Sequence, residues 1–565
     1  MRGTLWVALD SAFAGMTEKM ERGGECSPRI GRPDALDPLR MSAPPSLQRG
    51  PSLWGPTGLL LLAVALLGIA HVAFLPPFEG YDENAHWSYI QQIADQTRLP
   101  PAAESWLSGD VEDYAGPRPF QLSTPEKPSG AAFRRYFAEP HGDLAQPVPR
   151  VYRPTAHPNW EPRQQPPLYY LLLTPFYRLA QDWSWPDNFL LLRLASWTMA
   201  FAGFAIGSMA TQRCLRQWGA PAAVLLTVPA WPILFPEFFP EMARLGNDTL
   251  SLLFAGVAWH FVLRLLAAPR RGKAVLLGVA LGLGLLTKSF FLPISAGLAL
   301  LFLYAAIKRR EPRHVRDIAI ALVIAGLIGG YWYLDNLRVY GSVFGMTEFD
   351  AAARHGGLLH ALLGLPLSQL AGSLLHGLAL MVATFVWGGT WTLAHPPTYL
   401  MAPVVALAVL GFGLWLWRFF RWPLAGQAPL FLAAPLLAGL VSHQLLSIAT
   451  GGYVADTPGW YLHILSGPLS LALALGWRWR RVFGALAAYA VAFHALTWMG
   501  QLSLFSGCAY KPGPGQPLRL DVGSCLLVPS HLAELGAPVL GFTALALAVI
   551  AGGTALCWAW SAKHA

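Results

Sequence analysis

Charged residues are scarce in this chain. Asp, Glu, Lys and Arg together make up 13% of its 565 residues, whereas soluble globular proteins carry about 25%. Hydrophobic residues make up 54%, and several uninterrupted apolar stretches reach the roughly 20 residues that cross a bilayer. This composition excludes a soluble enzyme and a disordered chain. Because the stretches are continuous rather than alternating, it also excludes an outer-membrane barrel and predicts an all-α, polytopic transmembrane protein.

Cysteine is scarce as well. Five cysteines in this length exclude a secreted module built on disulfides. No CxxC or His/Cys ligand spacing occurs, so no metal site is expected. Cys508 and Cys525 share one polar loop and could form a bridge if that loop faces an oxidising compartment. Free thiols are expected for Cys26, Cys214 and Cys557.

The basic residues indicate the topology. A net charge of +9 could suggest a nucleic-acid binder, but the positive residues cluster in short turns between apolar stretches, so no nucleic-acid partner is expected. The positive-inside rule places these turns in the cytoplasm and gives about twelve spans, with both chain ends cytoplasmic. The turns contain Arg213 and Arg216; Arg264, Arg270, Arg271 and Lys273; Lys308, Arg309, Arg310, Arg313 and Arg316; Arg418 and Arg421; Arg478, Arg480 and Arg481; and Lys563.

Residues 358–397 do not fit this pattern. They are apolar but interrupted by Gly and Pro, and a full span there would place Arg418 and Arg421 outside. We expect helices that lie on the outer face or dip partway into the membrane, where protein must cover the backbone.

Three regions are predicted. Residues 1–55 form a polar segment without the layout of a signal peptide, expected to be disordered and cytoplasmic, and Met41 could also serve as a start. Residues 56–480 form the transmembrane core, in which 76–187 is a large first outer loop with short interfacial helices. Residues 481–565 form a C-terminal transmembrane hairpin with an outer loop at 502–535.

The first outer loop opens with PPFEGYDENAHWSYIQQIAD. A helix beginning near Asp82 would place Asp82, Glu83 and His86 on one face. A carboxylate pair beside a histidine suits general-base work on a hydroxyl or amine. Alternatively, Asp82 is only a helix N-cap and Glu83 an acid favoured by the helix dipole.

A double proline at 166–167 predicts the start of an amphipathic or interfacial helix later in this loop. Its Tyr169, Tyr170 and Tyr177 are best interpreted as membrane anchors at headgroup depth. Glu161 and Arg163 precede it.

Two further outer links carry charge. The stretch FPEFFPEMARLGNDTL contains Glu237, Glu241, Arg244, Asn247 and Asp248, of which Asn247 or Asp248 could merely cap the next span. Lys288, at an outer turn between two short spans, has no acid near it in sequence. It could snorkel to the interface or bind a phosphate as a point charge.

The last two links hold polar residues among aromatics, so aromatic-belt anchoring is an alternative for both. One contains Asp335, Asn336 and Arg338; the other contains Tyr453, Asp456, Trp460, Tyr461 and His463. All six outer links could converge on one cavity.

This layout resembles the GT-C superfamily of polytopic glycosyltransferases, which includes protein O-mannosyltransferases and lipid A aminoarabinose transferases. It is most similar to a bacterial branch with a PP-x-x-x-x-DE-x-x-H signature after the first span. The signature matches Pro76, Pro77, Asp82, Glu83 and His86. Other matches, in the expected order, are PPLYYLLL at 166–173, Arg193-Leu194, Asn247-Asp248, Thr287-Lys288, and Asn336 with Tyr340-Gly341.

The resemblance implies an outer-face, inverting, usually metal-independent transfer of a sugar from a polyprenyl-phosphate donor, with no cofactor. Asp82 would be the catalytic base, and Glu83 and His86 would orient it or contact the acceptor. A fixed cation would stabilise the charge that develops on the leaving phosphate. The implied substrate- and phosphate-binding residues are Lys288, Arg244, Arg338, Arg163, Asn247, Asp248, Asn336 and Tyr461. One departure is Trp460-Tyr461, where relatives often carry Arg-Tyr.

Three other functions stay open. A lipid-linked-sugar flippase or transporter would favour ionisable residues in mid-span, but here the charges occur almost only at span ends. A polysaccharide polymerase or ligase would differ mainly in using a lipid-linked oligosaccharide. In a non-catalytic assembly subunit, Asp82 would be only a cap.

Overall fold

The computed structural model describes residues 55–118, 131–354, 356–392, 396–451, 457–477, 480–510, 512 and 518–564. The predicted N-terminal segment, with Cys26 and Met41, lies outside these ranges except for its last residue, as do Tyr453 and Asp456 of the sixth outer link.

In the described ranges, ten helices are long and apolar enough to cross a membrane. The chain is therefore a predominantly helical, multi-pass membrane protein, as predicted. These helices are α2 (Pro56–Phe74), α8 (Trp185–Gln217), α12 (Asp248–Ala267), α14 (Phe291–Arg309), α15 (Arg313–Tyr340), α18 (Leu367–Val386), α19 (Thr398–Trp417), α20 (Leu424–Gly451), α22 (Arg480–Phe505) and α25 (Pro538–His564).

The difference from about twelve predicted spans comes from shorter helices that also connect the two ends of the bundle. Prolines at 229, 232, 236 and 240 divide residues 222–243 into short helices, because proline removes a backbone donor and clashes with the preceding turn. The short connecting helices are α9 (Ala222–Thr227), α10 (Trp231–Leu234), α11 (Phe238–Ala243), α13 (Arg271–Leu285), η3 (Gly459–Leu465) and α21 (Ser466–Gly476).

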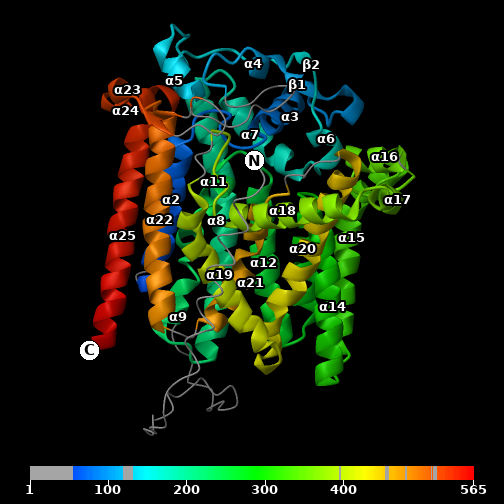
Figure 1. Ribbon diagram of the computed structural model, residues 1–565. Helices are drawn as coiled ribbons and strands as arrows, with labels where there is room; N and C mark the ends of the chain where they lie inside the picture. Colours follow the sequence, from blue (N-terminus) through cyan, green and yellow to red (C-terminus); the bar gives the residue numbers. More distant parts are fainter. Residues whose placement is uncertain are drawn as a thin grey trace. The chain divides into compact units, whose positions relative to one another are not determined.

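Residues 358–397 form α17 (Leu358–Leu363) and α18. By length and composition α18 could span a membrane, which the sequence did not predict. Figure 1 draws α18 across the direction of α14 and α15 rather than along it. This orientation agrees with the expectation of a helix near the outer face.

The two ends of the long helices differ in charge. The turns at 213–216, 264–273, 308–316 and 418–421 carry the basic residues, and we call the end where they lie the basic end. The opposite end, the site end, carries α3–α7 and α23–α24 (Figure 1). A short 3-10 helix, η2 (Phe419–Arg421), lies within one basic turn.

The predicted first outer loop folds around an aromatic cluster. Phe78 packs with ring centroids 5.0 Å from Tyr114, 5.2 Å from Trp185 and 4.7 Å from Phe189. Strands β1 and β2 pair antiparallel, a small sheet that the sequence did not predict. The elements of the loop are α3 (Glu83–Gln96), η1 (Ala102–Glu104), β1 (Trp106–Ser108), α4 (Gly109–Glu112), α5 (Ala131–Ala138), β2 (Pro154–Pro158), α6 (Glu161–Gln164) and α7 (Leu168–Leu179).

The loop between α22 and α25 contains a disulfide between Cys508 and Cys525, whose Cα atoms lie 4.4 Å apart. Arg134 of α5 forms an ion pair of 3.1 Å with Asp521, so this loop is tied to the first one. The bridge that the sequence leaves open is thus formed in the structure. The remaining elements are β3 (Ala509–Tyr510), β4 (Arg519–Leu520), α23 (Val522–Leu526) and α24 (Val528–Leu535) here, and α16 (Thr347–Arg354) after α15.

Candidate functional site

Asp82 occupies the N-cap position of α3 but does not cap it. Its side chain is exposed and makes no cap hydrogen bond. Its backbone is left-handed, with φ of 60°, a conformation that costs a non-glycine residue roughly 1–2 kcal/mol. The interpretation of Asp82 as a simple cap is therefore wrong. The side chain is instead presented to solvent by a strained turn.

Glu83 is fully buried and holds that turn in place. Its carboxylate pairs with Arg193 of α8 at 2.5 and 2.8 Å. It also accepts hydrogen bonds from the backbone N–H groups of Gly80 (3.0 Å) and Leu245 (2.8 Å). These bonds fix Glu83 and, through the chain, the turn that carries Asp82. The Glu83 carboxylate is too buried to contact an acceptor.

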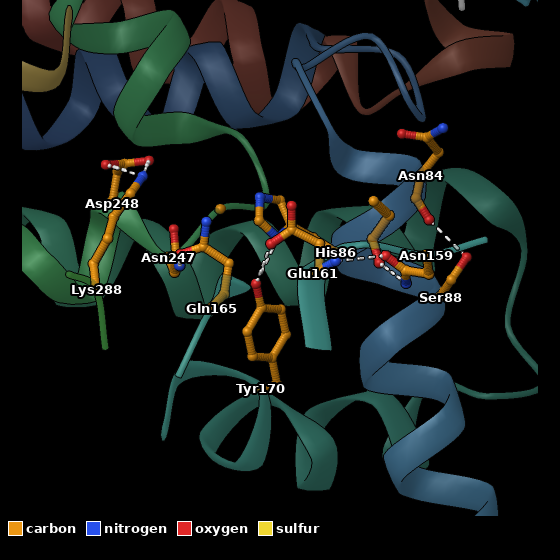
Figure 2. Close-up of polar contacts among 12 residues, drawn as sticks. Asn84, His86, Ser88, Asn159, Glu161, Gln165, Tyr170, Asn247, Asp248 and Lys288 are labelled. Atoms are coloured by element: carbon orange, nitrogen blue, oxygen red, sulfur yellow. Dashed lines mark hydrogen bonds and ion pairs between the residues drawn. The ribbon is translucent and has the colours of Figure 1, made fainter. Parts of the chain in front are cut away.

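His86 lies in a three-residue network with Glu161 and Tyr170 (Figure 2). Tyr170 donates its hydroxyl hydrogen to Glu161 Oε2 at 2.8 Å, and its oxygen lies 2.9 Å from His86 Nδ1. Burial, with Arg244 and Lys288 nearby, keeps the pKa of His86 well below its ordinary value. Burial and the charge of Asp82 raise the pKa of Glu161 to about 7.

The tyrosines of α7 are not membrane anchors. Tyr169, Tyr170 and Tyr177 are all completely buried, and Tyr169 hydrogen-bonds Ser196 of α8 at 2.8 Å. The prediction that they lie at headgroup depth is wrong, because α7 packs this face against α3 and α8. The predicted helix start after the double proline is confirmed.

Arg244 joins the turn at Asp82 to α11 and α12. It forms a two-bond ion pair with Glu241 at 2.7 and 2.9 Å and donates to the backbone carbonyl of Tyr81 at 2.8 Å. A weaker contact of 3.4 Å reaches Asp248. The Arg244 side chain is thus fully engaged within the protein.

Lys288 pairs with Asp248, whose two oxygens lie 2.8 and 2.7 Å from its Nζ (Figure 2). Asp248 is 40 positions from Lys288 in the sequence, so a search of the neighbouring residues finds no acid. The ammonium group also lies over the rings of Phe290 and Tyr461, at 4.6 and 4.5 Å from their centroids. Lys288 is therefore a buried, paired cation rather than a snorkelling one.

Asn247 lies beside this pair and donates to Gln165 at 2.8 Å (Figure 2). It occupies the N-cap position of α12 without a side-chain cap bond, so the capping alternative is wrong for it. Its Oδ1 is buried and has no hydrogen-bond partner among the described residues. An unpaired acceptor here is available to a ligand donor.

The other three candidates make their own contacts outside this group. Arg163 pairs with Asp350 of α16 at 2.6 Å. Asn336 is buried and lies against Gly345, next to the backbone of Arg163. Arg338 is exposed, and no contact with another described residue places it with the rest. Of the six predicted links, the fifth thus lies at the margin of the site.

A loop at residues 387–392 was missed by sequence reasoning. Glu237 Oε2 accepts hydrogen bonds from the N–H groups of Gly388 (2.6 Å) and Gly389 (2.7 Å). Tyr81 donates to the carbonyls of Gly388 (3.3 Å) and Thr390 (3.1 Å). The paired glycines were the available signal, because a Cβ at Gly388 would lie 2.5 Å from the Trp460 ring.

Glu79 secures the same loop. It accepts from Thr390 Oγ1 at 2.6 Å and from the backbone N–H of Thr392 at 2.8 Å. Burial raises its pKa to about 7. Glu79 and Glu237 thus both fasten the loop that Tyr81, the neighbour of Asp82, contacts.

The site therefore gathers side chains from five of the six outer links around one exposed carboxylate. The negative charge of Asp82 is close enough to Glu161, Arg244 and Tyr461 to influence their ionisation. Within the described part of the chain, no group of three or more His, Cys, Asp or Glu residues could hold a metal ion.

No family model and no curated protein matches the chain, but solved structures do. One is ArnT from Cupriavidus metallidurans bound to undecaprenyl phosphate (14% identity, 88% of this chain, 78% of that chain, TM-score 0.45). Another is the oligosaccharyltransferase AglB from Archaeoglobus fulgidus with an inhibitory peptide and a dolichol-phosphate (11% identity, 87% of this chain, 55% of that chain, TM-score 0.40). At these TM-scores the likeness does not indicate a function, which rests on the residues of this chain.

Proposed function

We propose that the protein is a membrane glycosyltransferase that moves a sugar from a polyprenyl-phosphate donor to an extracytoplasmic acceptor. The observation that carries this proposal is Asp82. It is an exposed carboxylate held in a strained left-handed turn, above buried ion pairs that fix the turn from α8, α11 and α12. Strain of this kind is typical of functional sites.

In this proposal Asp82 takes the proton of an acceptor hydroxyl or amine as that atom attacks the anomeric carbon. The new bond forms while the bond from the sugar to the phosphate oxygen breaks, and the electron pair leaves with the lipid phosphate. Attack opposite the leaving group inverts the anomeric centre. Lys288 and Arg244 supply positive charge in this proposal, and their shared partner Asp248 sets their position.

An apolar groove of about 460 Å³ between α7 and α8 suits the lipid tail. It is lined by Leu172, Phe176, Leu191, Leu194 and Met199, among others. Tyr170, which belongs to the site, lies on the same helix three residues before Leu173 of the groove. A tail in this groove would bring its phosphate to the edge of the polar network.

We also propose that the site end faces the extracytoplasmic side of a bacterial inner membrane. The basic turns gather at the opposite end, as the positive-inside rule requires for the cytoplasm. The disulfide between Cys508 and Cys525 lies in a loop of the site end, which suits an oxidising compartment.

The test is the glycan profile of cells that carry Asp82→Asn, compared with wild type and a deletion strain at equal membrane levels. Asp335→Asn is a matched control, because Asp335 is also an exposed acid at the site end. We expect the Asp82 variant to match the deletion and the Asp335 variant to match wild type. An Asp82 variant with a wild-type profile would contradict the role of Asp82.

A second candidate, transport of a lipid-linked sugar, draws on one observation. Two connections across the bundle are built from short helices, α9–α11 and η3–α21, and interrupted helices are typical of transporters. Under transport, Asp82→Asn would leave the profile unchanged.

A further inference from the structure

A second cavity lies at the basic end, far from the proposed chemistry. Its volume is about 470 Å³, and it is bordered by α2, α8, α9 and α25. Most of its lining is apolar, including Ala222, Leu225, Leu226 and Trp558. Trp558 is half exposed, as is common for tryptophan at a membrane interface.

One corner of the cavity is polar and ordered. Gln212 is almost fully buried and donates to the hydroxyl of Thr57 at 3.2 Å and to the carbonyl of Leu225 at 2.9 Å. Its carbonyl oxygen accepts from Arg216 Nη2 at 3.2 Å. Gln212 therefore holds the Arg216 guanidinium at the cavity wall. Among the described residues, the other N–H groups of this guanidinium have no carboxylate partner.

The arginines at this corner are not paired with an acid of the described chain. Arg213 is a like-charged neighbour of Arg216. In the described ranges, no carboxylate lies within ion-pair distance of either. The first turn of α2, which also borders the cavity, has no acid and no side-chain cap, so the positive end of its helix dipole adds to the same field.

We propose that this cavity binds one anionic phospholipid of the cytoplasmic leaflet. Arg216 would bind the phosphate, and the acyl chains would lie against Leu225, Leu226 and Trp558. A free anion would use the polar corner but leave the apolar wall exposed, whereas an amphipathic anion satisfies both. Basic pockets between transmembrane helices on the cytoplasmic side are suited to anionic lipid headgroups.

The test is native mass spectrometry of the full-length protein in detergent, titrated with phosphatidylglycerol or phosphatidylcholine. For wild type we expect one tightly bound phosphatidylglycerol, preferred over phosphatidylcholine by roughly tenfold, because both lipids carry the phosphate but the choline cation of phosphatidylcholine offsets its charge beside Arg213 and Arg216. Arg216→Gln should remove that preference. Ala222→Trp, which fills the cavity without a change of charge, should weaken both lipids.

Arg270→Gln is the matched control, because Arg270 is an exposed arginine of the basic end that does not line the cavity. It should bind like wild type, and a melting temperature for each variant verifies folding. Undiminished preference in Arg216→Gln would overturn the proposal. So would competition by inorganic phosphate at the same concentration, since that result indicates an anion site without tails. Should Ala222→Trp fail to fold, Arg216→Gln alone decides.

Discussion

At the site end, buried cations pair with buried acids, two of them from distant segments, whereas the ion pairs described at the basic end join neighbours in sequence, such as Arg316 and Asp317 (2.6 Å). Arg193, Arg244 and Lys288 each lie 2.5–2.7 Å from a carboxylate, and their side chains are at most 8% exposed. At the basic end, Lys273 donates instead to the backbone carbonyls of Arg264 and Ala268, at 3.1 Å.

The difference indicates two uses of charge in one molecule. Exposed cations after helix C-termini satisfy free carbonyls and set the orientation in the membrane, and each contributes little to stability. Buried pairs hold segments of distant sequence together, and breaking one leaves an unpaired charge inside the protein. The stability of the site end therefore depends on individual ion pairs. At the basic end, orientation in the membrane depends on the total positive charge.

The largest expected effect follows from breaking a buried pair. Arg193→Ala leaves Glu83 buried without its partner, so we expect the free energy of unfolding to fall by about 3–5 kcal/mol. Denaturant unfolding of the purified protein in detergent measures this. Arg338→Ala is the control, because Arg338 is exposed at the same end. If both variants unfold alike, the ion pair does not hold the turn.

The second-largest effect on the free energy of unfolding is expected from reduction of the disulfide. Reduction of Cys508–Cys525, which closes a loop of 17 residues, should cost about 3 kcal/mol. In thiol labelling without reductant, exposed Cys557 should react, buried Cys214 should react only after denaturation, and the bridged pair only after reduction. Labelling of Cys508 and Cys525 without reductant would contradict the bridge.

The acids near Asp82 should make stability depend on pH. Burial raises the pKa of Glu161 to about 7, so the fold favours the protonated form. Its contribution is then fully present below the ordinary carboxyl pKa and is lost as pH rises through 7. We expect wild type to lose on the order of 1–3 kcal/mol between pH 5 and 8, and Glu161→Gln to lose less.

Melting temperature across that pH range measures the effect. Glu79, whose pKa burial also raises to about 7, supplies a second contribution that Glu79→Gln should remove. Exposed Glu104 is the control, since Glu104→Gln should leave the curve unchanged. A flat wild-type curve would show that neither acid is protonated by the fold.

The smallest effect is expected at the basic end. Arg270→Gln should change the free energy of unfolding by no more than about 0.5 kcal/mol, as for most surface substitutions. A loss as large as that of Arg193→Ala would remove the distinction between the two ends.

The sequence predicted features that local patterns encode. Apolar stretches located the long helices, the double proline located α7, and the Asp-Glu motif located α3 within one residue. The broken crossing at α9–α11 was counted as a span because its apolar content is continuous even though its backbone is not.

Pairings between distant segments could not be predicted. Glu83 and Arg193 are 110 positions apart, and Arg163 and Asp350 are 187 apart. The sequence leaves snorkelling or phosphate binding open for Lys288, because its partner Asp248 is 40 positions away, on α12. Tyr170 was interpreted as an anchor because a tyrosine in an apolar helix suits headgroups or a polar site equally well, and only the packing of α7 decides.

The central claim is that Asp82 performs the chemistry and the buried pairs around it position it. The most direct measurement is the amount of polyprenyl-phosphate sugar and of glycosylated product in membranes carrying Asp82→Asn, quantified by mass spectrometry beside Asp335→Asn. We predict that the donor accumulates and that transfer falls by about 10²–10⁴-fold, the usual share of a general base, while the protein stays folded. Donor and product at wild-type levels in a folded Asp82→Asn protein would contradict the account.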